Sequence, residues 1–63
     1  MKLIDVKQLA IFLGISPKTI YGWVHREKIP CYKLEGSLRF NLDEIQKWIK
    51  SKKRKVRGRV DII

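Results

Sequence analysis

The chain has 63 residues, enough for one small domain that buries only about 60% of the surface of its unfolded chain. Fifteen Lys and Arg residues stand against six Asp and Glu residues, and the resulting net charge of +9 favours a polyanionic partner, above all nucleic acid. Cys31 is the only cysteine and His25 the only histidine, which excludes an internal disulfide and a four-ligand Cys/His metal site.

The first predicted helix covers residues 6–13. Its apolar positions follow the i, i+3, i+4, i+7 spacing of one helix face: Val6, Leu9, Ala10 and Leu13. Asp5 precedes them as the N-cap, and Gln8 lies three residues on, where it completes a capping box. Gly14 follows as the residue that ends the helix, because glycine adopts a left-handed backbone at little cost.

A second helix is predicted over residues 17–27, with Ser16 as its N-cap and Pro17 in its first position. Its apolar face consists of Ile20, Trp23 and Val24. Basic side chains complement the negative end of the helix dipole: His25, Arg26 and Lys28. The pair Ile29–Pro30 is expected to stop this helix, because a residue before proline avoids the helical region.

The segment 31–40 predicts a β-hairpin with its tight turn at Gly36–Ser37. A third helix follows over residues 42–51, with Asn41 as its N-cap and Glu44 in its third position. Its apolar face consists of Ile45, Trp48 and Ile49, and we expect both Trp23 and Trp48 to be largely buried. The fold class is therefore mainly α with a small β-hairpin: a winged helix-turn-helix of three helices and a two-stranded wing.

The domain is expected to span residues 1–51. From residue 52, six of eight residues are basic and no apolar period remains, so residues 52–63 are predicted to form a basic, flexible tail. No stretch approaches the roughly 20 apolar residues of a membrane span, and the first ten residues lack the apolar run of a signal peptide. We expect a cytoplasmic protein with no membrane partner and no cofactor.

Two short helices joined by a tight turn are typical of a helix-turn-helix, although such a pair can also be plain packing. The outward face of the second helix carries Lys18, Tyr21, Gly22 and His25, with no acidic residue among them. Gly22 makes the helix less stable than alanine would, by about 0.8–1 kcal/mol. Two explanations stay open: DNA approaches closely at Gly22, or the glycine makes room beside Trp23.

The start of the second helix offers backbone N–H groups beside Ser16 and Thr19, which suit a phosphate; Ser16 has capping alone as its alternative role. Lys33, Ser37 and Arg39 suit a DNA-contacting wing, with a plain surface hairpin as the alternative. The full set of predicted DNA contacts is Ser16, Lys18, Thr19, Tyr21, Gly22, His25, Arg26, Lys28, Lys33, Ser37, Arg39, Lys52, Lys53 and Arg54.

Residues 3–50 resemble the excisionase-family DNA-binding domains, relatives of the MerR-type winged helix-turn-helix. The matching segments are LIDVKQLAIFLGIS, SPKTIYGWVHREKIP, a wing ending in RF, and a helix of the form DEIQKWI. The resemblance implies that the second helix enters the major groove, that the wing touches backbone or minor groove, and that Trp48 packs the third helix onto the core. At Gly22 the chain departs from the family, whose members often carry a basic or polar residue there.

The resemblance also implies a bacterial, nucleoid-associated setting, in a phage, plasmid or integrative element or as a small transcription regulator. We therefore expect sequence-specific binding of double-stranded DNA, by an excisionase-like recombination directionality factor or a regulator of a mobile element. A recombinase or integrase and further copies of the chain are the other partners considered.

We expect no enzyme, because the acidic residues Asp5, Asp43 and Glu44 are used at helix starts and no Ser-His-Asp set or paired carboxylate is present. The alternatives are a protein-interaction module with a nonspecific basic tail, and the DNA-binding piece of a longer recombinase.

Overall fold

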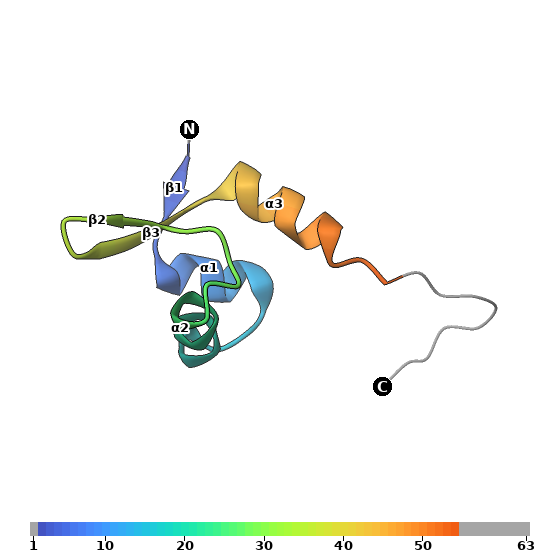
Figure 1. Ribbon diagram of the computed structural model, residues 1–63, viewed down its shortest axis with the longest axis horizontal. Helices are drawn as coiled ribbons and strands as arrows, with labels where there is room; N and C mark the ends of the chain where they lie inside the picture. Colours follow the sequence, from blue (N-terminus) through green and yellow to red (C-terminus); the bar gives the residue numbers. More distant parts are fainter. Residues whose placement is uncertain (1, 55–63) are drawn as a thin grey trace.

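Three helices and three short strands make up the computed structural model, which describes residues 2–54 (Figure 1). In chain order they are β1 (Leu3–Ile4), α1 (Val6–Leu13), α2 (Pro17–His25), β2 (Tyr32–Leu34), β3 (Ser37–Asn41) and α3 (Leu42–Ser51). The predicted winged helix-turn-helix is confirmed. The flexible tail predicted from residue 52 falls mostly on residues 55–63, outside the described part of the chain, and stays a prediction.

The starts of α1 and α2 are capped as predicted. Asp5 Oδ1 accepts a hydrogen bond from the Gln8 amide at 2.8 Å, and Gln8 Oε1 accepts one from the Asp5 amide at 3.1 Å, which completes the capping box. Gly14 ends α1 with φ 72°, in the left-handed region. Ser16 then caps α2, because its Oγ accepts from the Thr19 amide at 3.3 Å. These caps fix the short connection between the two helices.

The helix α2 ends at His25, two residues earlier than predicted, and the prediction that Ile29–Pro30 stops it is wrong. Glu27 adopts φ 53°, and the amide after it, that of Lys28, donates to the carbonyl of Trp23 at 2.9 Å. The left-handed backbone conformation of Glu27 turns the chain out of the helix before Pro30. For a residue with a Cβ this backbone costs roughly 1–2 kcal/mol.

We expect Glu27→Gly to stabilise the domain by about 1 kcal/mol, because glycine adopts a positive φ with little strain and this gain exceeds its larger loss of entropy. The midpoint of urea unfolding measures the change. Gln46→Gly is the matched control: Gln46 is exposed within α3, where glycine should destabilise by about 1 kcal/mol. Equal losses in both variants would contradict the strain at Glu27.

The hairpin turn lies one residue earlier than predicted. β2 and β3 are antiparallel and pair Leu34 with Ser37, so Glu35 and Gly36 form the two-residue loop. Their φ angles are 50° and 87°, and positive values at both positions define a type I′ turn. The predicted turn at Gly36–Ser37 is wrong because Ser37 already belongs to β3.

A third strand, β1, was not predicted. It pairs antiparallel with β3, with Leu3 opposite Asn41 and Ile4 opposite Phe40, and the strand order is β1-β3-β2. Two residues are too few to show the alternation that identifies a strand in a sequence. β1 makes β3 the central strand of the sheet.

Side chains from four elements meet in the core. The fully buried ones are Leu9 of α1, Ile20 of α2, Phe40 of β3 and Ile45 of α3. Trp23 and Trp48 pack against this core at its edge, with ring centroids 5.6 Å apart and planes tilted by 57°. The prediction that both are largely buried therefore holds only in part. Trp48 Nε1 donates to the carbonyl of Lys28 at 2.9 Å, a bond that ties α3 to the segment after α2.

A second polar contact joins α3 to the hairpin. Asn41 caps α3 as predicted, its Oδ1 accepting from the Asp43 amide at 2.9 Å. The Glu44 carboxylate accepts from the Tyr32 hydroxyl at 2.8 Å. This hydrogen bond, together with burial and the charge of Glu44, raises the pKa of the Tyr32 phenol above its ordinary value. The hydrogen bond links β2 of the hairpin to the first turn of α3.

Candidate nucleic-acid interface

The outer face of α2 carries an unusual set of side chains. Lys18, Tyr21 and His25 are exposed there, and Gly22 lies between them. Their spacing of three, four and seven residues places them on one face of the helix, away from the buried Ile20. A cation, a phenol and an imidazole can each donate a hydrogen bond to an acceptor on a partner. No carboxylate in α2 opposes a negatively charged one.

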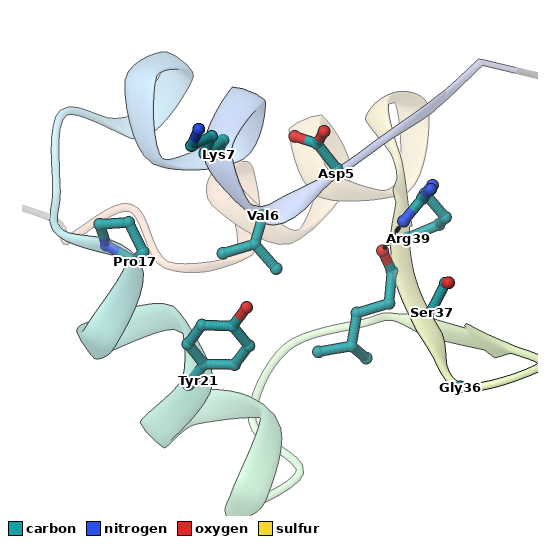
Figure 2. A pocket seen from close by; sticks show the side chains of 9 residues that line it. Asp5, Val6, Lys7, Pro17, Tyr21, Gly36, Ser37 and Arg39 are labelled. Atoms are coloured by element: carbon teal, nitrogen blue, oxygen red, sulfur yellow. Dashed lines mark hydrogen bonds between the residues drawn. The ribbon is translucent and has the colours of Figure 1, made fainter.

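A groove of about 570 Å³ runs between α2, the start of α1 and the hairpin. The Tyr21 ring projects into it from α2, towards Val6 (Figure 2). The lining comes from all three elements: Asp5, Val6, Lys7, Pro17, Tyr21, Gly36, Ser37, Leu38 and Arg39. The structure thus brings Tyr21 together with the two predicted contacts on β3, Ser37 and Arg39.

A second groove, of about 390 Å³, also lies between α2 and the hairpin, and Tyr21 lines both. His25 and Lys33 line this second groove with Tyr21, and the hairpin residue Gly36 contributes to both. The two hairpin cations are therefore divided between the grooves. Pairing in the sheet explains the division, because Lys33 lies opposite Leu38 and Arg39 opposite Tyr32, on different faces.

The side chains of Arg39 and Lys33 differ in burial as well as in position. Arg39 is half-buried, and its Nη1 donates to the carbonyl of Leu38 at 2.7 Å, so the guanidinium is held against its own strand. Lys33 is exposed. A guanidinium fixed in this way keeps its other N–H groups for an acceptor such as a phosphate oxygen.

In the first turn of α2 the Lys18 amide is the donor left for a partner, because Pro17 has no N–H and the Thr19 amide donates to Ser16. The Ser16 hydroxyl is used as the cap and also lies 3.1 Å from Thr19 Oγ1. Both residues are exposed, as a phosphate contact at this helix start requires. Capping and phosphate binding are compatible, because the Ser16 hydroxyl serves the Thr19 amide and the Lys18 amide is not used by the cap.

Lys28 and Lys52 lie apart from the wing. They line an apolar groove of about 360 Å³ with Trp23 and Trp48, and Lys52 Nζ is 5.8 Å from the centroid of the Trp48 ring. Trp23 is two residues from Tyr21, about 200° around the helix, so this groove is on the opposite flank of α2. Lys53 and Arg54 are exposed beyond α3, which extends away from the hairpin (Figure 1).

Lys7 is a candidate contact that the sequence analysis missed. It is exposed in the first turn of α1 and lines the same groove as Tyr21 and Arg39. Its position on the polar face of α1 was readable from the sequence. Its place beside the wing was not, because that depends on how β3 packs against α1.

Within residues 2–54, no helix is long and apolar enough to cross a membrane. In the same part of the chain, His, Cys, Asp and Glu side chains form no group of three or more that could hold a metal ion.

A protein-family model described as a helix-turn-helix domain matches residues 3–53. This range includes every helix and strand described above. No curated protein and no solved structure matches the chain.

Proposed function

Because this chain belongs to a family of helix-turn-helix domains, we propose that it binds double-stranded DNA in a sequence-dependent manner. In this proposal α2 enters the major groove, α1 braces it, and the β2–β3 hairpin is the wing. The observation that best supports the proposal is the outer face of α2, which offers donors at Lys18, Tyr21 and His25 and has no acidic residue. The hairpin adds one cation to each of the two neighbouring grooves. A major groove about 12 Å wide admits one helix with such side chains.

The candidate residues divide into two roles. Lys18, Tyr21 and His25 on α2 are proposed to meet base edges. The other predicted contacts except Gly22, and also Lys7, are proposed to meet phosphate or groove walls: Ser16, Thr19, Arg26, Lys28, Lys33, Ser37, Arg39, Lys52, Lys53 and Arg54. Of these, Lys28 and Lys52 lie on the opposite flank of α2, so their proposed contacts are with phosphates outside the groove that α2 enters. Phosphate contacts fix register and affinity, whereas base contacts carry the sequence preference.

Binding to any duplex is expected to weaken steeply with salt. Each phosphate that the protein neutralises adds about −0.9 to the slope of log K against log salt, so four such contacts give a slope of about −3.6. Titration of a fluorescently labelled random duplex at several salt concentrations measures this slope. A slope indistinguishable from zero would contradict electrostatic DNA binding.

The finer role that we propose is that of a small excisionase-like directionality factor or a transcription regulator of a mobile element. The resemblance of residues 3–50 to excisionase-family domains supports it. A directionality factor assembles a recombinase or further copies of itself by shaping DNA, and bending a site costs on the order of 1–6 kcal/mol. Mobility of circularly permuted fragments distinguishes the two roles, because a plain repressor leaves the mobility independent of the site's position.

A protein-interaction module is the second candidate, favoured by apolar side chains exposed on α1. Ile11 is 83% exposed and Phe12 is 48% exposed. Selection from a randomised duplex library separates the candidates. Enrichment of one sequence supports the DNA-reading function. Recovery of unrelated sequences would favour the interaction module with nonspecific charge. If the chain is the DNA-binding piece of a longer recombinase, the enriched sequence is that enzyme's site.

A further inference from the structure

Gly22 is the sixth residue of the nine in α2, a position where glycine is unfavourable. Glycine loses more backbone freedom in a helix than any other residue, so alanine would hold α2 better. Among the glycines of residues 2–54, Gly14 and Gly36 have positive φ angles, and Gly22 does not. Its backbone conformation therefore gives no reason for a glycine.

Packing within the folded chain gives no reason either. A Cβ added at Gly22 would meet Arg26 Nη2 at 3.8 Å, an ordinary van der Waals distance to the end of a flexible side chain. The neighbouring Trp23 leaves α2 about 100° further round the helix and packs against Trp48. The folded domain has room for a methyl group at this position.

We propose that Gly22 is the point where α2 comes closest to the base edges of the major groove, an inference that rests on the proposed DNA-binding function. Gly22 lies in the middle of the outer face, with Lys18 one turn before it and His25 about one turn after it. Without a Cβ, the helix axis can approach the groove floor. A methyl group projecting about 1.5 Å would push α2 outward and lengthen the hydrogen bonds of Tyr21 and His25.

Base edges, rather than the phosphate backbone, are the atoms that this position suits. Glycine supplies no charge and no side-chain donor for a phosphate oxygen. Its CH₂ group can contact an apolar base atom such as the thymine methyl group. Of the cations that suit phosphates, Lys33 and Arg39 lie on the hairpin, and Arg26 reaches the Gly22 position only with the end of its flexible side chain.

Gly22→Ala should therefore make the domain more stable and its DNA binding weaker. We expect its Tm to rise by about 4–8 °C. We expect its affinity for the duplex that the wild type selects from a randomised library to fall at least tenfold, with little change on a scrambled duplex. Gln46→Ala is the control: Gln46 is exposed on α3, and its replacement should leave both affinities unchanged.

The outcomes separate this inference from the function on which it rests. If the wild type prefers its selected duplex and Gly22→Ala binds it equally tightly, the inference is wrong and the function stands. A wild type that binds both duplexes alike contradicts sequence-dependent binding itself. A fall in Tm would show that the space at Gly22 is not free. Equal weakening on both duplexes would place the close approach at the phosphate backbone and overturn the base contact.

Discussion

Phe40→Ala is expected to cause a large loss of stability. Phe40 is fully buried in the central strand, opposite Ile4 of β1. Removing a buried Phe side chain costs about 3–5 kcal/mol, because apolar contacts are lost and a cavity remains. A domain of this size has a free energy of unfolding of only about 3–9 kcal/mol. The substitution therefore removes at least a third of this free energy. If the free energy of unfolding lies at the lower end of its range, the substitution removes all of it.

Circular dichroism during urea unfolding measures this effect. Phe12→Ala is the matched control, since Phe12 is 48% exposed on α1 and its loss should change the stability by about 0.5 kcal/mol. Phe40→Leu keeps most of the buried volume and should fold with an intermediate midpoint. A Phe40→Ala domain that unfolds at the wild-type midpoint would contradict the placement of β3 at the centre of the core.

Capping residues explain why the bounds of α1 and α3 were predictable. Asp5 and Gln8 signal the start of α1, Gly14 signals its end, and Asn41 signals the start of α3. These residues act locally, through hydrogen bonds and φ angles within a few positions, so a sequence pattern is enough. The end of α2 and the hairpin turn differ. Each depends on a glutamate with positive φ, a residue type that gives no signal for such a backbone.

The depth of burial and the grouping of charges were less predictable. Helical spacing correctly placed Ile20 and Trp23 on the inner side of α2, but it could not tell that Ile20 fills the core and Trp23 lies at its edge. The split of Lys33 and Arg39 between two grooves depends on how the hairpin packs beside α2 and the start of α1. Tertiary packing decides both, and neither is encoded in a local pattern.

Alanine at Tyr21 is expected to reduce sequence preference, whereas alanine at Lys33 should reduce affinity alone. Tyr21 lies between the two grooves on the helix proposed to read bases, and a good base contact contributes about 1–3 kcal/mol of discrimination. Lys33 is exposed on the hairpin and is proposed to meet phosphate. Its loss should weaken selected and random duplexes alike and reduce the salt slope by about 1.

Measuring each variant on both duplexes at two salt concentrations separates reading bases from holding phosphates. Tyr21→Phe shows whether the hydroxyl or the ring makes the contact, because it removes the hydroxyl alone. Truncation after Lys52 keeps every helix and strand and removes five basic residues, so it should weaken both duplexes alike, as Lys33→Ala does, and reduce the salt slope by more. If truncation abolishes the preference and Tyr21→Ala retains it, α2 is not the reading element. Sequence recognition would then lie in the basic segment, and the helices would only position that segment on the DNA.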